Sequence, residues 1–167
     1  MPVFPSIAWL ERVAQLALHD DAYRRLGRVD ALVGLKVGDS SFRLTFDVLE
    51  ISDIREIGDD ELRDLDFYLD MEPERWQAML ETIHAHGQAE RDFTLNSLDL
   101  MLPDGLHQNA TGDGYRADKF FRFNESLQRF FDLSAGVETT FASPSAPDSS
   151  RDASGTAASS ERLRPSE

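Results

Sequence analysis

The chain has 167 residues, 41% of them hydrophobic, and a formal net charge of −14 at pH 7. This length can bury one ordinary core, so we expect one folded domain. The negative charge argues against nucleic acid and anionic membrane surfaces as general electrostatic partners, because both would be repelled unless a local basic patch intervened. The absence of cysteine excludes disulfides, thiolate metal sites and a cysteine nucleophile.

The amino-terminal residues have no features of a targeting segment. The stretch "MPVFPSIAWLERVAQ" lacks the basic start and the unbroken apolar run of a secretory signal. No other stretch approaches the ~20 apolar residues that a membrane-spanning helix needs. We therefore expect a cytoplasmic protein.

The first predicted element is an amphipathic helix that begins after Ser6 and ends near Gly27. Serine is a favourable N-cap, because its hydroxyl accepts a hydrogen bond from a free amide of the first turn. Four apolar residues follow at the spacing of one helix face, namely Trp9, Val13, Leu16 and Ala17.

Four β-strands are predicted next. Residues 29–37 and 41–51 flank the turn "GDS", and the second run alternates between apolar and polar side chains, which is typical of a hairpin with one buried face. Residues 53–57 and 65–71 form two shorter runs separated by the acidic turn "GDDELRD". We expect all four strands to form one mostly antiparallel sheet, as a meander.

Two further helices are predicted after the strands. Pro73 suits a first helical turn, and apolar residues at helical spacing then extend the helix to about residues 86–87. Residues 94–102 favour a short helix capped by Thr94, although the same run is compatible with a strand. Residues 103–114 consist of turn-forming residues and predict a long loop.

The stretch "KFFRFNESLQRFF", residues 119–131, contains five of the eleven phenylalanines. A single helix would leave Phe121 exposed, about 100° away from the apolar face. A strand over residues 115–123 followed by a helix capped by Asn124 avoids this exposure, and we favour it. In this arrangement Phe121 and Phe123 share one side of the sheet, and the cations Lys119, Arg122 and Arg129 face solvent.

The carboxyl-terminal segment differs from the rest of the chain in composition. From Gly136 onward it is rich in Ser, Ala, Pro and Thr and has one aromatic residue, Phe141. Such a segment buries too little apolar area to offset the entropy of ordering it. We therefore expect a folded domain over residues 1–135 and a disordered tail over residues 136–167.

This order of elements resembles the sterol carrier protein type-2 family. The resemblance rests on "WLERVAQLALHDDAYRRL", "MEPERWQAML" and "KFFRFNESLQRFFDL", which together span about residues 6–134. It implies an α+β sandwich in which about five mostly antiparallel strands are covered by three to four helices. It also implies an apolar tunnel for sterols, fatty acids or fatty acyl-CoA, without catalysis or a cofactor.

A cavity of this kind needs only apolar walls, so the candidate binding residues are large apolar side chains on the predicted strands and helices. These are Phe42, Phe46, Trp76, Met79, Leu80, Phe121, Phe123, Leu127 and Phe130. Each of them could equally be an ordinary core residue. The expected partner is a hydrophobic small molecule.

Two other functions are compatible with the sequence. One is an interaction or accessory subunit, a homodimer included, that docks through an aromatic face. The other is a small enzyme acting on a hydrophobic substrate, with His19 or His107 as the base. The spacing of His84 and His86 does not fit two metal ligands on one helix face, so no metal site is expected.

Overall fold

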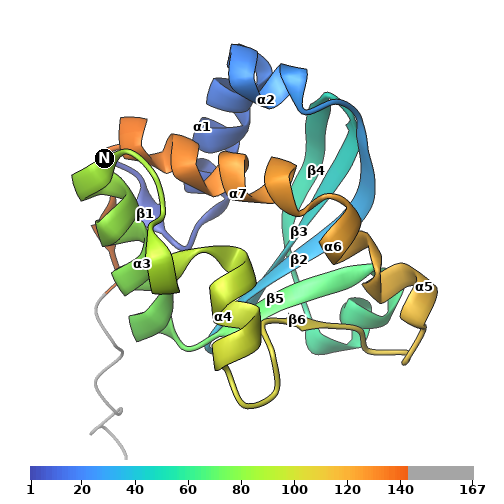
Figure 1. The fold of residues 1–167 in the computed structure, drawn as a ribbon. Helices are drawn as coiled ribbons and strands as arrows, with labels where there is room; N and C mark the ends of the chain where they lie inside the picture. The colour runs from blue at the N-terminus through green and yellow to red at the C-terminus, as the bar shows by residue number, and fades with distance from the viewer. Residues whose placement is uncertain (143–167) are drawn as a thin grey trace, which may run out of the picture.

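A computed structural model describes residues 1–142, which form an α+β fold with a five-stranded mixed sheet and seven α-helices. The strands run side by side in Figure 1, with α7 beside the sheet and α1 and α3 on either side of α7. The main core lies between these helices and one face of the sheet. Coarsely, this is the predicted α+β class with about five strands, but the described residues form seven α-helices where three to four were predicted, because the first predicted helix divides in two and the predicted closing strand forms two short helices instead.

The predicted first helix is two helices, α1 (Ile7–Leu18) and α2 (Asp21–Arg25). Its start is as expected, because the Ser6 hydroxyl accepts the Trp9 amide at 3.1 Å. The break comes at Asp20, whose carboxylate accepts the Tyr23 amide at 2.8 Å and so begins a new helix. Asp20 is a strong N-cap inside an otherwise helical pattern, and this local hydrogen bond ends the first helix early.

The sheet has the strand order β4-β3-β2-β5-β6. Its members are β2 (Val29–Val37), β3 (Ser40–Val48), β4 (Glu50–Ile57), β5 (Phe67–Met71) and β6 (His107–Gln108). The hairpin of β2 and β3 is confirmed, with Val37 opposite Ser40 across the turn. The predicted strand over residues 41–51 is divided at Val48, where a φ of 61° turns the chain back into β4.

The predicted meander is wrong at its fourth strand. β5 does not extend the sheet beyond β4 but pairs in parallel with β2, placing Leu69 opposite Leu35. The 3₁₀-helix η1 (Asp59–Asp64) makes this crossover. Its Leu62 packs with Ile57 and Leu65 against the sheet face opposite the main core, and burial of this second cluster explains why the chain crosses over.

Two of the middle helices are confirmed. α3 (Pro73–His86) has proline at its start and ends at Gly87, whose φ of 82° suits glycine. The short 3₁₀-helix η2 (Arg91–Phe93) precedes α4 (Leu95–Met101), which Thr94 caps by accepting the Ser97 amide at 3.2 Å. The loop predicted after α4 contains the short strand β6, which occupies the sheet edge beside β5.

The predicted closing strand over residues 115–123 is wrong. These residues form the short helices α5 (Gly114–Ala117) and α6 (Lys119–Arg122), and α7 (Asn124–Asp132) follows. Asn124 is the first residue of α7 rather than its N-cap. β6 already pairs with β5, so a strand over residues 115–123 would have needed another sheet edge to pair with. In the helical conformation Phe120 is buried without such pairing.

The folded part extends beyond the predicted boundary at residue 135. The 3₁₀-helix η3 (Leu133–Gly136) leads to the buried Val137, and β7 (Thr140–Phe141) pairs in parallel with β1 (Val3–Phe4). Pairing with the amino terminus supplies the apolar contacts that composition alone does not indicate. The predicted disorder of residues 143–167 lies outside the described residues.

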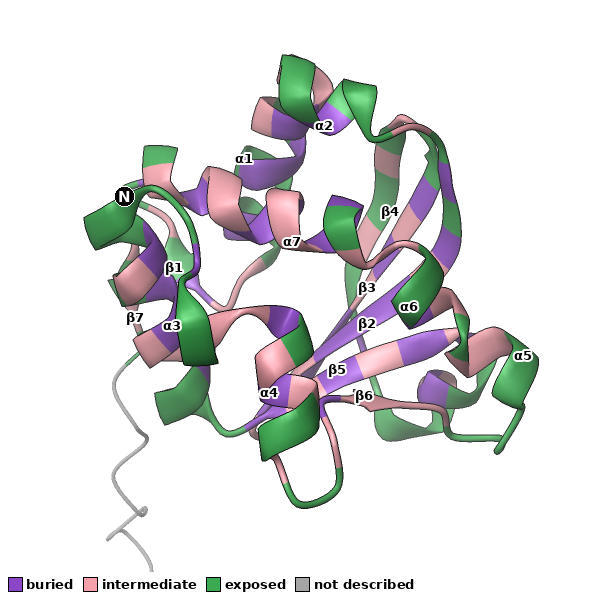
Figure 2. Cartoon of the chain, in the orientation of Figure 1, coloured by how far each residue is buried: buried purple, intermediate pink, exposed green. Residues whose placement is uncertain are grey.

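The core follows the alternation of the strands. Buried residues fill the inward positions of β2, β3 and β5 and the facing sides of α1, α3 and α7, as the purple segments of Figure 2 show. In register, Val33 lies between Leu44 of β3 and Phe67 of β5. The period of two that predicted the hairpin therefore also places its apolar side chains on the core face.

Candidate functional site

Seven of the nine predicted binding residues lie in the main core and are almost fully buried. They come from three elements that are distant in the sequence, namely β3, α3 and α7. The seven residues are Phe42, Phe46, Trp76, Met79, Leu80, Leu127 and Phe130. The fold therefore brings these seven side chains together in one core cluster.

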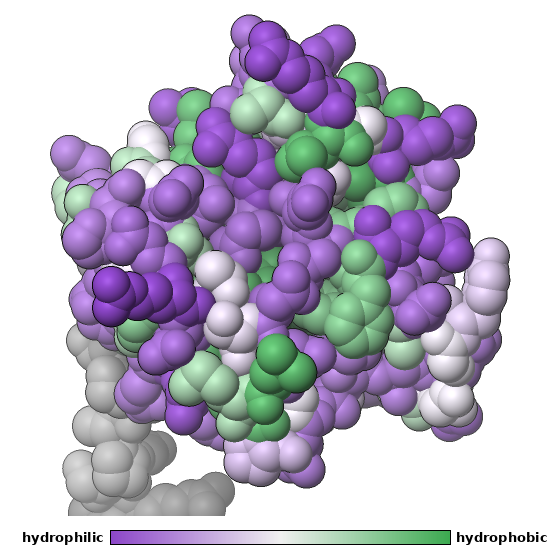
Figure 3. Space-filling view, in the orientation of Figure 1, coloured by the Kyte–Doolittle hydropathy of each residue, from purple (hydrophilic) through white to green (hydrophobic). Residues whose placement is uncertain are grey.

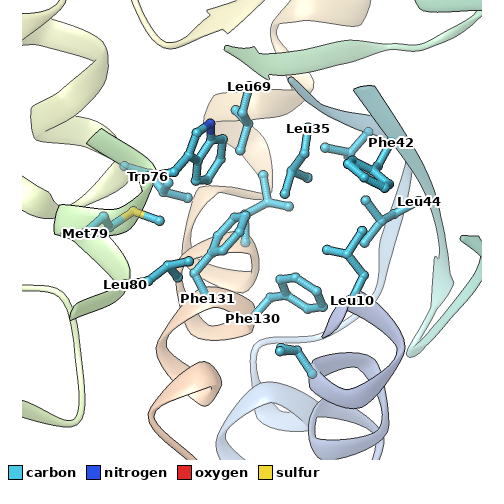
Figure 4. Packing of buried hydrophobic residues seen from close by; sticks show 14 of the residues in the cluster. Leu10, Leu35, Phe42, Leu44, Leu69, Trp76, Met79, Leu80, Phe130 and Phe131 are labelled. Carbon is cyan, nitrogen blue, oxygen red and sulfur yellow. The ribbon is translucent and has the colours of Figure 1, made fainter. Parts of the chain in front are cut away.

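Within the core these side chains contact one another. The Phe46 and Phe130 rings meet edge to face with centroids 5.9 Å apart, and Trp76 lies 5.6 Å from the ring of Phe131. Figure 4 shows Trp76, Phe130 and Phe131 pointing toward the apolar side chains of the sheet. The indole nitrogen of Trp76 is also bonded, donating to the Lys36 carbonyl at 3.0 Å. At these positions the core side chains therefore pack against one another.

The remaining two predicted residues lie outside this core. Phe121 is 56% exposed, and Phe123 is only partly buried against the cluster. The predicted placement of Phe121 on an inward sheet face is therefore wrong, because residues 119–122 are helical and Phe120 takes the buried position. The single-helix alternative had foreseen this exposure.

A surface pocket lies between α3 and the segment that follows α7, and we call it the α3 pocket. Its volume is about 540 Å³. It combines apolar side chains with hydroxyl and charged groups. The lining residues are Met1, Leu80, Glu81, His84, Ala85, Ser134, Glu138, Thr139 and Phe141. Of the nine predicted binding residues, Leu80 alone belongs to this lining.

Ser134 gives the α3 pocket an unusual polar group. Its side chain is 3% exposed, and its hydroxyl oxygen is buried without a hydrogen-bond partner among the described residues. Most buried hydroxyls in proteins are bonded, because an unmet hydrogen bond costs about 1–3 kcal/mol. A ligand in the pocket could supply the missing partner.

The charged groups of the α3 pocket are mostly acidic. Glu81 and Glu138 are both exposed, and Glu81 accepts a hydrogen bond from Gln77 at 2.8 Å. Sequence reasoning missed Ser134, Glu138 and Phe141, two of which fall in the segment predicted to be disordered. Phe141, the one aromatic residue of that segment, was the available signal that part of it packs.

A second group of interest joins α4 to β6. The Nδ1 atom of His107 lies 2.8 Å from a carboxylate oxygen of Asp99, which also accepts the amides of Leu106 and His107. The imidazole stacks on Phe120 at 4.5 Å, and its edge contacts Phe121 at 5.0 Å. This arrangement orients the ring and leaves Nε2 without a hydrogen bond among the described residues.

The carboxyl group of Asp99 is shifted toward its charged form. Burial by itself would raise the pKa of Asp99, but the hydrogen bonds from the His107 ring and from two backbone amides outweigh it, so the pKa lies below its ordinary value. Asp99 therefore accepts these hydrogen bonds as a charged carboxylate, and the two backbone amides that it binds fix the loop before β6. The other histidine considered as a base, His19, is exposed and lies beside an aspartate that pairs elsewhere.

Among residues 1–142, no three His, Asp or Glu side chains gather as a possible metal site. Over the same residues, no helix has the length and apolar character needed to span a bilayer.

No protein-family model, curated protein or solved structure matches this chain. The resemblance to the sterol carrier family therefore stays a prediction from the sequence.

Proposed function

We propose that this chain binds a small hydrophobic molecule without catalysis, and that the α3 pocket accepts it. The observation that supports this proposal best is a pocket of about 540 Å³ whose lining includes the apolar Leu80 and also Ser134, whose buried hydroxyl has no hydrogen-bond partner among the described residues. Small-molecule sites in proteins typically enclose roughly 300–1,000 Å³. A fatty-acyl chain or a sterol-like ring system is of suitable size.

The apolar wall of this pocket is supported by the core. Leu80 lies on the same buried face of α3 as Trp76 and Met79, so its position is fixed by core packing. Phe141 is held by the pairing of β7 with β1. A wall fixed in this way loses little entropy when a ligand arrives, which favours binding.

Hydrophobic binding predicts how affinity depends on the length of an apolar ligand. Each methylene removed from water contributes about 0.8 kcal/mol, or about fourfold in affinity. Affinity for a series of linear alcohols should therefore rise by about this factor per carbon until the pocket is filled. Displacement of the uncharged fluorophore N-phenyl-1-naphthylamine from the full chain measures this series.

Ala85→Trp tests the location of the site. Ala85 is an exposed helical residue in the pocket lining, so an indole there would occupy the pocket without disturbing the core. We expect at least about tenfold weaker binding, from the loss of two or more buried methylenes. Ala22→Trp is the matched control, because Ala22 is an exposed helical residue of α2 away from the pocket.

Two results would count against this proposal in different ways. Equal binding by Ala85→Trp and wild type would show that the ligand binds outside the α3 pocket. Absence of any bound lipid in the purified protein, together with no binding of alcohols, fatty acids or sterols, would remove the function itself.

A second candidate function is docking through an apolar surface over α4 and α6. On α4, Leu100 is 86% exposed and Met101 is 54% exposed. The exposed Phe121 of α6 lies near α4, because its ring contacts His107, and His107 is hydrogen-bonded to Asp99 of α4. Figure 3 shows hydrophobic surface over these two helices on one face of the molecule. We take the partner to be a second copy of the chain, joined through the same surface on both copies, because such a dimer needs no other protein.

Light scattering after size exclusion tests this second candidate. A dimer that dissociates in the Phe121→Ser variant would support it, whereas a monomer at high concentration would remove the second copy as the occupant. The exposed Tyr115→Ser is the matched control for loss of a surface ring.

A further inference from the structure

The chemistry of the α3 pocket indicates which head group its ligand carries. Resting on the proposed function, we infer that the ligand is an alcohol, with an apolar body and one uncharged hydroxyl, rather than a fatty acid or another carboxylate. This inference concerns the selectivity of the pocket and can fail while hydrophobic binding itself stands.

The buried hydroxyl of Ser134 is the first ground. Its oxygen can both donate and accept a hydrogen bond and does neither within the described residues. A ligand hydroxyl has the same dual capacity, so one alcohol can satisfy Ser134 and bond a second group in the pocket. A purely apolar ligand would leave the Ser134 hydroxyl unpaired.

The charges around the pocket are the second ground. Two carboxylates, of Glu81 and Glu138, line it, against one amino group of Met1 and the imidazole of His84. A third carboxylate on the ligand would be repelled by the two glutamates and would also lose its hydration. A hydroxyl avoids both costs and can donate to a glutamate oxygen.

The test compares decan-1-ol with decanoate, which share an apolar chain and differ in the head group. Displacement of N-phenyl-1-naphthylamine from the full chain is measured at pH 8, above the ordinary titration range of histidine. We expect decan-1-ol to bind at least about tenfold more tightly than decanoate. Because an ionised acid is intrinsically less hydrophobic than an alcohol, variants must show that the pocket itself contributes.

The variant Glu81→Gln/Glu138→Gln removes the two negative charges and keeps the size of the side chains. Decanoate affinity should rise at least about threefold, while decan-1-ol affinity changes little. The control Glu56→Gln/Glu125→Gln removes two exposed carboxylates outside the pocket lining, so it produces the same net charge. It should leave the affinity ratio of the two ligands as in wild type.

Ser134→Ala tests the hydrogen bond. Removing the hydroxyl should weaken decan-1-ol about fivefold, the equivalent of one ordinary hydrogen bond. The folded variant is recognised by an unchanged circular dichroism spectrum, since the substitution removes one unbonded atom and creates no overlap.

The outcomes separate the two proposals. Decanoate binding as tightly as decan-1-ol, or an affinity ratio unchanged by Glu81→Gln/Glu138→Gln, overturns the inference about the head group and leaves hydrophobic binding intact. If neither ligand binds the wild-type chain, the proposed function is overturned and the inference falls with it.

Discussion

Asp20 and Arg129 are joined by two hydrogen bonds of 2.9 Å, although 109 residues separate them in the chain. The same carboxylate caps α2 by accepting the Tyr23 amide. Arg129, which the sequence placed in solvent, thus ties α7 to the start of α2. The hydrogen bonds from Arg129 lower the pKa of Asp20, burial opposes them, and the Tyr23 amide lowers the pKa further, with a net shift downward.

Arg129→Met should lower the free energy of unfolding by about 1–2 kcal/mol, since the pair is charge-assisted and bidentate but partly exposed. Arg116→Met is the control, because the Arg116–Asp113 pair is single, 3.7 Å long and more exposed. It should change stability by less than about 0.5 kcal/mol. Urea unfolding at pH 7 measures both variants, and equal losses would contradict the role given to Arg129.

The same pair predicts a pH dependence. The folded-state pKa of Asp20 lies below its ordinary value of 3.8, so its contribution is present above about pH 3.8 and is lost as the pH falls through the lowered pKa. The stability difference between wild type and Arg129→Met should therefore shrink on acidification. A constant difference between pH 7 and pH 2.5 would contradict this prediction.

Asp99→Ala should be more costly than His107→Phe. The Asp99 carboxylate accepts two backbone amides and the His107 ring, whereas phenylalanine at 107 keeps the stacking on Phe120 and leaves the two amide bonds in place. We expect a loss of about 2–3 kcal/mol for Asp99→Ala and about half of that for His107→Phe. Urea unfolding gives both values, and a larger loss for His107→Phe would contradict this ranking.

The His107→Phe variant also tests a catalytic role. If the ring serves only to fix the loop before β6, ligand binding at the α3 pocket should be unchanged. A bound hydrophobic ester that wild type hydrolyses and His107→Phe leaves intact would instead favour His107 as a base.

Gly34→Ala should destabilise the protein by roughly 1–3 kcal/mol. A Cβ atom at Gly34 would lie 2.6 Å from a methyl of Leu65 and 2.8 Å from the Cβ of Tyr68. Tyr68 pairs with Gly34 across the parallel strands, so its Cβ cannot move without shifting β5. Gly114→Ala is the control, because nothing lies within 4 Å of its added Cβ, and it should be neutral or slightly stabilising. Thermal unfolding distinguishes the two, and equal melting temperatures would contradict the close approach.

Tyr23→Phe should stabilise the protein by about 1 kcal/mol, since the Tyr23 hydroxyl is buried without a partner among the described residues. Tyr115→Phe, at an exposed ring, should be neutral. Burial also raises the pKa of Tyr23 to about 12. The stability that depends on its neutral phenol is therefore present below pH 10 and is lost as the pH rises toward 12. A loss of stability in Tyr23→Phe would mean that the hydroxyl has a partner.

Local elements were predictable because their signals are local. Ser6 and Thr94 begin helices through hydrogen bonds to amides three residues away, and Gly87 ends α3 through its own backbone conformation. The alternation of residues 42–46 likewise selected the buried face of β3, whereas Val48, the next apolar residue of the pattern, is 40% exposed where the strand ends. In each case the deciding atoms are within a few residues in sequence.

The failures concern partners that are distant in sequence. Whether residues 115–123 form a strand depended on a free sheet edge, and β6 occupies the edge beside β5. The position of β5 depended on burial of Leu62 and Leu65 over the second sheet face. Residues 137–141 pack because β1 lies beside them.

The sequence by itself determined the α+β class, the first hairpin, α3, α4 and several of the residues that form the core. Tertiary structure alone decided that these residues contact one another, that Phe121 is exposed, and that Leu80 and Ser134 line one pocket. The physical reason is that hydrophobic periodicity specifies which side chain is buried but not what it is buried against. That choice depends on contacts across the whole chain, as the bond between Asp20 and Arg129 illustrates.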